Sequence, residues 1–316
     1  MVRIAVAGGT GGLGRTLVDE LCQCDEHSVF VLSRKSQLSF EAPDNVHCLA
    51  IDYESVPQLQ NLLESNQIHT VISTMNPPTP EVQTAQNNLI QAAAQSGTVK
   101  RFVPSEWGID YFNDDEHVPL PWKTVKQQAI AELEKYPSLQ YTMVHNGYFM
   151  DYFGMPQCQS HMLAEIPYVD IAAAKAAIPG SGNDKVTFTY TKDVAKFVRK
   201  LVESDDKWPT RTFIAGDVVT FHEIVEAAEQ ARGRKFDVVH DSLQDLREGK
   251  VTEIPAYRPI YKIFPKEFLL QMMAGFGVAM VTGIFAFEGK FLNEKHPEVR
   301  TTKMRDFIMT YWSGRH

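Results

Sequence analysis

Residues 2–14 read VRIAVAGGTGGLG, a short apolar run that leads into a glycine-rich loop. The run predicts a strand over Val2–Ala7, and the loop fits both G-x-G-x-x-G and G-x-x-G-x-x-G spacings. Glycine permits the tight turn and lets backbone N–H groups approach a pyrophosphate, while the start of a helix adds its positive dipole end. The loop therefore predicts a dinucleotide-binding site made by Gly8, Thr10, Gly11, Gly12, Leu13 and Gly14.

The first hundred residues alternate short apolar runs with amphipathic segments. Further strands are expected over Ser28–Leu32, Val46–Ile51, His69–Ser73 and Lys100–Val103. Helices are expected over Arg15–Cys24, Val56–Ser65 and Pro80–Ser96. Apolar strands that alternate with helices indicate a parallel sheet covered on both faces, so we predict an α/β fold of the doubly wound Rossmann type.

The alternation of strands and helices becomes less regular after residue 103, and no linker or repeat marks a separate second domain. Further elements are expected as a helix from about Pro121, a strand over Gln140–His145, a helix capped by Thr191 and a helix capped by Thr220 that ends near Gly233. We predict a dinucleotide-binding domain over residues 1–150. Residues 151–316 would form a smaller, partly interleaved α/β lobe for the substrate.

An uncharged stretch over Phe268–Phe287 is long enough to cross a bilayer. It contains three glycines and a glutamine and is alone in the chain, so membrane insertion is the weaker interpretation. We expect two short buried helices, or one helix with a glycine-broken turn, beside an apolar cavity.

Composition and charge exclude several classes of protein. The 316 residues carry 31 Lys plus Arg against 39 Asp plus Glu, a net charge of −8, which weighs against nonspecific binding to nucleic acid or anionic membranes. A strand that starts at Val2 leaves no secretory signal, so we expect a cytoplasmic protein. The cysteines form no C-x-x-C pair and are expected to be reduced thiols: Cys22, Cys24, Cys48 and Cys158.

The end of the second strand predicts which dinucleotide binds. An NAD site places an acidic residue about twenty residues after the glycines, but this chain has Ser33, Arg34 and Lys35 there. Two cations suit a 2′-phosphate, and arginine can bind it through two donors, so we predict NADP(H). Asp52 is expected at the adenine edge, and Thr74, Met75 and Asn76 near the ribose and nicotinamide, because ligands bind at the carboxyl ends of parallel strands.

A Tyr-x-x-x-Lys pair is absent, because none of the eleven tyrosines has a lysine four residues later. This disfavours the common short-chain type of carbonyl reductase. The helix after Pro121 offers two lysines instead. Lys126 lies within its apolar stripe and Lys123 at the edge of that stripe, and helical phase does not choose between them.

Three stretches of the chain form a recognisable set: GGTGGLG, HTVISTMN and GTVKRFVPSEWG. On these stretches the chain resembles the NmrA-like, isoflavone-reductase-like group of atypical short-chain dehydrogenases, with Trp107 in place of the usual phenylalanine. The strand before Gly147, Tyr148 and Phe149 and the segment from His296 to Val299 follow in the same order. In the reductase branch the catalytic lysine precedes the alanine of an R-R-A-I segment by six residues. The matching Q-Q-A-I segment here points to Lys123, with Lys126 in reserve.

The resemblance implies hydride transfer from NADPH to an enone, quinone methide or imine of a small aromatic or polyketide-like substrate. Lys123 would act as general acid or base beside the cofactor. Ser105 and the Gly147–Phe149 segment would adjoin the cofactor. The same segment, with residues 268–287, would wall the substrate. His145 and Tyr148 are either accessory donors or core residues, and we expect the second. The pocket rim is expected to include Tyr111, Phe112, Asp114, Asp115 and Glu116.

The alternative from the same family is a non-catalytic NADP(H)-sensing regulator that binds a partner protein. The histidines show no H-x-x-x-H or H-E-x-x-H spacing, so no metal ligands are predicted. No nucleic-acid partner and no membrane insertion are expected. The sequence leaves open whether the protein forms a homodimer.

Overall fold

A six-stranded parallel sheet organises the N-terminal half of the computed structural model, which describes residues 2–76, 79–112, 118, 120, 122–163 and 167–315. The strand order is β3-β2-β1-β4-β5-β6, the order of a doubly wound dinucleotide fold. The strands are β1 (Val2–Ala7), β2 (His27–Ser33), β3 (Val46–Ala50), β4 (Thr70–Ser73), β5 (Arg101–Val103) and β6 (Gln140–Tyr141). The predicted α/β class is confirmed.

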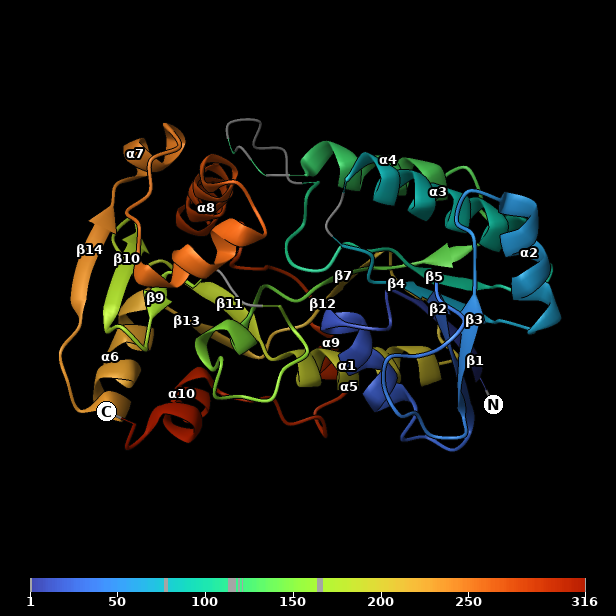
Figure 1. Cartoon of the computed structure of the whole chain (residues 1–316), viewed down its shortest axis with the longest axis horizontal. Coiled ribbons are helices and arrows are strands. Elements are labelled where there is room, and N and C mark those ends of the chain that lie inside the picture. The colour runs from blue at the N-terminus through green and yellow to red at the C-terminus, as the bar shows by residue number, and fades with distance from the viewer. Residues whose placement is uncertain are drawn as a thin grey trace.

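Helices cover both faces of this sheet (Figure 1). On one face lie α1 (Gly12–Leu21) and α5 (Thr191–Glu203); on the other lie α2 (Val56–Ser65), α3 (Pro80–Gln95) and α4 (Lys123–Leu133). Alternate strand residues serve the two layers, because successive side chains point to opposite faces. Ile4 and Val6 pack toward α1 and α5, whereas Ala5 and Ala7 pack toward α2, α3 and α4. Burial on both faces explains the continuous apolar runs.

The second half builds a lobe of small sheets and helices. One sheet joins β8 (Tyr148–Phe149), β11 (Val186–Thr189) and β13 (Asp217–Val219), and another joins β9 (Val169–Asp170), β10 (Lys175–Pro179) and β14 (Asp237–Asp241). The helical elements are η1 (Met150–Phe153), α6 (Phe221–Arg232), α7 (Leu243–Arg247), η2 (Pro255–Lys262), α8 (Lys266–Val281), α9 (Leu292–Lys295) and α10 (Met304–Trp312). The expected cap of α6 is confirmed, since Thr220 and Glu223 form a capping box and Gly233 ends the helix at φ 61°.

The two halves exchange elements. The expected strand over residues 140–145 is wrong as one unit, because it divides at Thr142: β7 (Met143–His145) leaves the large sheet and pairs with β12 (Arg211–Phe213). Helix α5 comes from the second half but packs on α1, side by side in Figure 1. The division of the chain at residue 150 stays a prediction.

Two helices begin at residues other than those expected. Helix α1 spans Gly12–Leu21, not 15–24, because its hydrogen bonds already begin at the loop, where the Arg15 N–H donates to the Gly11 carbonyl at 3.1 Å. Thr191 is the first residue of α5 and not its cap, which is Tyr190. The carboxylate of Asp151 accepts hydrogen bonds from the Thr191 backbone N–H at 2.9 Å and from its hydroxyl at 2.7 Å.

The uncharged stretch forms one helix that ends in a glycine turn, as one of the two expected arrangements has it, and the alternative of two short helices is wrong. Helix α8 runs through both of its interior glycines and stops before Gly283, which has φ +85°. A Cβ on Gly277 would lie 2.9 Å from a Leu246 methyl group, so glycine here admits the neighbouring α7. No helix within the described ranges is long and apolar enough to cross a membrane.

Candidate cofactor and substrate site

Packing requires glycine at two positions of the N-terminal loop, Gly8 and Gly14, and leaves little room at a third, Gly9. Gly8 has φ +80°, and a Cβ there would lie 2.8 Å from the Thr74 hydroxyl oxygen. A Cβ on Gly14 would overlap the Gly8 carbonyl and the same hydroxyl. A Cβ on Gly9 would lie 3.1 Å from a Val18 methyl group and 3.2 Å from a Val31 methyl group. The loop is therefore pressed against the end of β4, where the Thr74 hydroxyl donates to the Ala7 carbonyl at 2.8 Å.

Gly11 and Gly12 face the other way. A Cβ on either residue would meet no described protein atom within 4 Å. Gly11 occupies the N-cap of α1, and no side chain caps the backbone donors of the first turn. An open cradle at a helix N-terminus fits a dinucleotide pyrophosphate, and these residues therefore suit the expected cofactor.

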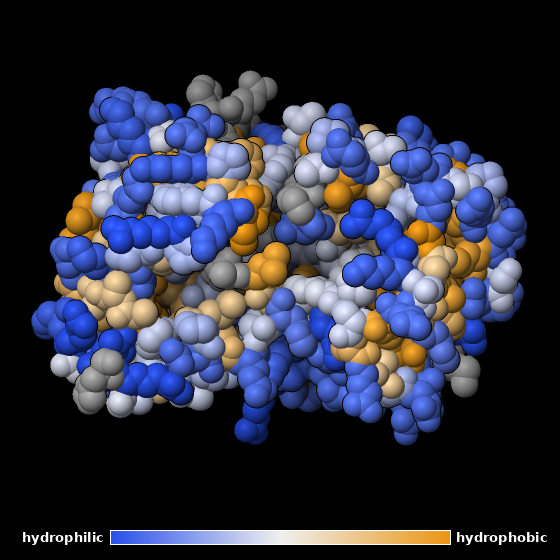
Figure 2. Space-filling view, viewed as in Figure 1, coloured by the Kyte–Doolittle hydropathy of each residue, from blue (hydrophilic) through white to orange (hydrophobic). Residues whose placement is uncertain are grey.

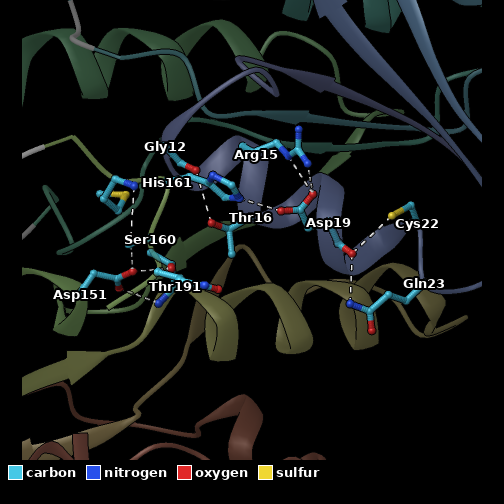
Figure 3. Close-up of polar contacts among 12 residues, drawn as sticks. Gly12, Arg15, Thr16, Asp19, Cys22, Gln23, Asp151, Ser160, His161 and Thr191 are labelled. Carbon is cyan, nitrogen blue, oxygen red and sulfur yellow. Dashed lines mark hydrogen bonds and ion pairs between the residues drawn. The ribbon is translucent and has the colours of Figure 1, made fainter. Parts of the chain in front are cut away.

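A strap from the second half, residues 160–162, lies against this cradle (Figure 3). The His161 carbonyl accepts a hydrogen bond from the Gly12 N–H at 3.1 Å, and the His161 ring lies 2.7 Å from an Asp19 carboxylate oxygen. The Ser160 hydroxyl donates to Asp151 at 2.6 Å. Sequence reasoning missed His161 and Asp151, because their partners are 142 and 40 residues away and no local pattern marks them.

The predicted 2′-phosphate residues stand at the carboxyl end of β2. Ser33 ends the strand, and its hydroxyl accepts the Lys35 backbone N–H at 3.0 Å. The Arg34 and Lys35 side chains are exposed, so both charges are available to a ligand. Asp52 is also exposed beyond β3, and its carboxylate accepts the Glu54 N–H at 2.9 Å.

The ends of β4 and β5 are locked together at the same edge. The Ser105 hydroxyl donates to the Met75 carbonyl at 3.0 Å. The Gln86 side-chain oxygen accepts both the Ser105 N–H at 3.0 Å and the Ser73 hydroxyl at 2.7 Å. The Trp107 indole donates to the Ser73 carbonyl at 2.9 Å, a bond that phenylalanine could not make. The segment of Thr74, Met75 and Asn76 thus leaves β4 beside Ser105, and its contact with the ribose and nicotinamide stays a prediction.

The two candidate lysines have different surroundings. Lys123 opens α4 and is half-buried. It follows Trp122, whose φ of 68° is rare for a residue with a side chain. Lys126 is buried, and its ammonium donates to the Ser105 carbonyl. Burial lowers the pKa of the Lys126 amine, which the nearby Glu106 opposes.

Glu106 is the least expected group at this edge. Its side chain is fully buried, and neither carboxylate oxygen has a hydrogen-bond partner among the described residues. Burial raises the pKa of Glu106 to about 7, although the Lys126 charge works in the opposite direction. The Glu106 carboxyl can therefore gain or lose a proton near neutral pH, next to Lys126 of α4.

Aromatic rings of the second lobe pack against Trp122, the residue before Lys123. The Phe276 ring on α8 lies 6.4 Å from Trp122 and 6.4 Å from Tyr148, between centroids, and Phe268 lies 6.5 Å from Trp122. Phe268 is also 38 % exposed, a high value for this side chain. Figure 2 shows hydrophobic side chains on the flank of this lobe that faces the sheet. The arrangement offers flat apolar surfaces to a ligand.

Other predicted residues of the second lobe serve the core. Gly147 has φ +70°, and a Cβ there would overlap the Thr187 carbonyl. His145 is fully buried, with Nδ1 3.0 Å from the Ile109 carbonyl, and burial lowers its pKa to about 4. This is a neutral core histidine. Phe149 is half-buried, with its ring 6.0 Å from that of Tyr152.

The predicted pocket rim is corrected in part. Tyr111 is only 3 % exposed and belongs to the core of the second lobe, with the Lys126 ammonium 5.9 Å from its ring centroid. Phe112 is half-buried, with the Arg211 guanidinium 5.8 Å from its ring centroid. Asp114, Asp115 and Glu116 lie outside the described residues. A cavity of about 360 Å³ between residues 201–213 and 290–296 contains none of the predicted site residues.

Fold and site together define an α/β protein with a dinucleotide cradle at its N-terminus. The NmrA-like family model matches residues 2–278. Oxidoreductase BOA1 of Botryotinia fuckeliana is 37 % identical over 301 residues, which cover 95 % of this chain and 96 % of that protein. An isoflavone reductase homolog, A622 of Nicotiana glauca, is 28 % identical over 321 residues, which cover 96 % of both.

A solved structure of AtPrR2 with NADP+ and (+)pinoresinol superimposes with a TM-score of 0.75 at 22 % identity, covering 98 % of each chain. The fold is thus shared with that protein. The chain belongs to the NmrA-like family and is an oxidoreductase of the isoflavone-reductase-like kind.

Proposed function

We propose that the protein is an NADPH-dependent reductase that transfers hydride to an electron-poor carbon of a small aromatic or polyketide-like metabolite. The observation that carries the proposal is the open cradle at Gly11 and Gly12, which lies at the same sheet edge as the exposed Arg34 and Lys35. A pyrophosphate in the cradle and a 2′-phosphate at the cations would place the nicotinamide toward Ser105 and α4. When bound, NADPH supplies the hydride.

Lys123 is the proposed general acid or base. Lys126 suits this role less well, because its side chain is buried, whereas that of Lys123 is half-buried. Lys123 stands one turn earlier, next to Trp122 and across from the rings of α8. A cation there would protonate or polarise the oxygen that gains charge as hydride arrives, or remove a phenol proton.

The substrate class follows from the walls of the approach. Trp122, Phe276 and Phe268 present ring faces and edges from two different elements, which favours a flat, apolar acceptor with one polar oxygen or nitrogen. An enone, a quinone methide or a cyclic imine meets this description. The neighbouring structure holds (+)pinoresinol, an aromatic ligand of that protein. We extend only the aromatic character to this chain.

The experiment pairs nucleotide binding with turnover. Purified protein is titrated with NADPH by fluorescence, and then the loss of NADPH absorbance is followed with phenolic enones, quinones and cyclic imines. Turnover on one class supports the reductase and names its substrate. Binding without turnover across the panel favours a nucleotide-sensing regulator. The free cysteines fit the reducing cytoplasm that we propose as its location, and a homodimer stays a prediction.

A further inference from the structure

We propose that Cys24, His27 and Glu203 form a zinc-type metal site at the end of α1 that lies far from the nucleotide loop. Cys24 lies in the turn between α1 and β2, His27 is the first residue of β2, and Glu203 is the last residue of α5. One ligand atom from each of the three side chains lies within 4.8 Å of the other two. The site is independent of the proposed reductase activity.

His27 is the observation that points to a ligand. Its side chain is only 4 % exposed, and neither ring nitrogen has a hydrogen-bond partner in the described part of the chain. A buried imidazole without partners is costly, because both nitrogens lose their hydrogen bonds with water. A metal ion accepts the lone pair of a neutral imidazole and removes that cost on one side.

The spacing between His27 and Glu203 fits two ligands of one ion. The distance from Nε2 to the carboxylate oxygen is 3.6 Å, longer than a hydrogen bond. Zinc bonds to nitrogen and oxygen of about 2.0–2.2 Å, at a tetrahedral angle, place the two ligand atoms roughly 3.4 Å apart. Cys24 supplies a thiolate three residues before His27, and a change of its side-chain rotamer would close the remaining gap.

The backbone around these residues is held in place without a metal. The Asn45 side-chain amide donates to the Cys22 carbonyl at 2.9 Å and to the His27 carbonyl at 3.2 Å. The His27 N–H donates to the Cys24 carbonyl at 2.9 Å. Because α1 packs along α5, the turn is brought to Glu203 by the core of the sheet layer. Cys24 and His27 are thus held near each other by the backbone that links α1 to β2, and Glu203 comes from the second half of the chain.

The surrounding charges permit a divalent ion. A thiolate and a carboxylate together neutralise it, and the exposed Asp25 and Glu26 lie in the same turn. Two cations oppose binding: Arg199 lies 3.6 Å and Lys200 lies 4.0 Å from Glu203. Both have other carboxylates as partners. Arg199 pairs with Glu20 at 2.8 Å, and Lys200 pairs with Glu298 at 3.5 Å. A metal would displace only these two longer contacts of Glu203.

The ligand set selects the ion. Thiolate and imidazole favour zinc over magnesium or calcium, and three protein ligands leave the fourth position to water. Bound zinc would join the turn after α1 to the end of α5 and so tie the two halves together. It would lie at the end of the sheet opposite to the cofactor, so its expected role is structural.

The test uses Co²⁺ as a spectroscopic probe of the metal-stripped, full-length protein. We expect one equivalent of Co²⁺ to give visible d–d bands and a thiolate-to-cobalt charge-transfer band. Cys24→Ser should abolish the charge-transfer band, and His27→Gln should weaken binding by about 100-fold or more, since even outer-shell losses cost about 10–100-fold. Cys22→Ser is the matched control, because the Cys22 thiol contacts the Asp19 carbonyl instead, and it should keep both bands.

Glu203→Gln provides a second test on a partly exposed side chain, where folding is least at risk. It should weaken Co²⁺ binding, and Zn²⁺ should raise the melting temperature of the wild type but not of this variant. The proposal is overturned if wild type gives no charge-transfer band, or if the band survives Cys24→Ser. NADPH binding by the same samples reports on the cradle separately.

Discussion

The Gly12 backbone N–H donates to the His161 carbonyl at 3.1 Å, so the second half of the chain contacts the first turn of the nucleotide-binding helix directly. The ring of the same histidine lies 2.7 Å from the carboxylate of Asp19, about two helical turns beyond Gly12 in α1. The strap therefore uses one of the donors that a pyrophosphate would also use. Strap and phosphate are expected to compete for Gly12.

Loosening the strap should tighten nucleotide binding. His161→Ala removes the contact with Asp19, an exposed pair of about 0.2–1 kcal/mol, and leaves the loop residues intact. The expected result is an NADPH Kd up to about fivefold lower, measured by fluorescence titration. His240→Ala is the control, since that ring contacts the Gly180 carbonyl in the other lobe. Weaker binding by the His161 variant would mean that the strap belongs to the nucleotide site.

Two glycines of the same loop should respond differently to alanine. Gly11→Ala adds a methyl group to open space at an extended φ of −164°, so it should fold normally but lose affinity for NADPH by about tenfold or more, which corresponds to about 1.4 kcal/mol. Gly14→Ala drives a methyl group into the Gly8 carbonyl and should destabilise the fold by about 1–3 kcal/mol. Thermal melts and titrations of both variants check this. Equal stability of the two variants would contradict the assigned packing.

Arg34 should determine the preference for NADPH over NADH. A charge-assisted hydrogen bond contributes about 1.5–3 kcal/mol, so Arg34→Ala should raise the NADPH Kd by roughly 10–100-fold. Affinity for NADH, which lacks the 2′-phosphate, should change little. The NADH titration is the internal control. An equal loss for both nucleotides would show that Arg34 supports the loop and not the phosphate.

The two lysines of α4 should separate catalysis from stability. Lys123→Ala should abolish turnover while NADPH affinity and melting temperature stay near the wild-type values. Lys126→Met should lower the melting temperature, because it removes the donor to the Ser105 carbonyl and leaves Glu106 buried alone, at a cost of about 1–3 kcal/mol. Surviving turnover in the Lys123 variant would show that the catalytic lysine is misassigned.

Glu106 should make the protein less stable as the pH rises. Its pKa is raised from 4.5 to about 7 in the folded state, so the folded chain holds more protons between these values. The contribution of Glu106 to the free energy of unfolding is fully present below about pH 4.5 and is lost as the pH rises through about 7. Glu106→Gln should therefore stabilise the protein at pH 8 relative to pH 5, on the order of 1–3 kcal/mol. Urea unfolding at both pH values measures the difference, and a gain independent of pH would contradict it.

Local patterns in the sequence were enough for the sheet layer. Strands buried on both faces must be apolar throughout, so a run such as Val2–Ala7 can be predicted as a strand from its sequence alone. The glycine-rich loop that follows it predicts the nucleotide-binding cradle. Patterns failed where a distant partner decides. The strand divides at Thr142 because β6 pairs with β5, whereas β7 pairs with β12, about 70 residues later. The glycines of α8 suggested breaks, but Gly277 admits α7 within an unbroken helix.

The candidate site likewise contains residues that local sequence patterns predicted and residues that they did not. Arg34 follows β2 directly, so the end of that strand predicted its place, whereas Ser105, two residues beyond β5, was expected from the family resemblance. His161, Asp151 and the paired burial of Glu106 with Lys126 depend on the packing of segments that are far apart in sequence. Helical phase placed Lys126 on the buried stripe but could not show that the Ser105 carbonyl would receive its ammonium.

The central claim, an NADPH-dependent reductase, is tested most directly by one titration followed by one assay. Wild-type protein should bind NADPH more tightly than NADH, and it should oxidise NADPH in the presence of at least one aromatic enone, quinone methide or cyclic imine. NADPH binding without oxidation across the whole panel would contradict catalysis, and no binding of either nucleotide would contradict the cradle at Gly11 and Gly12.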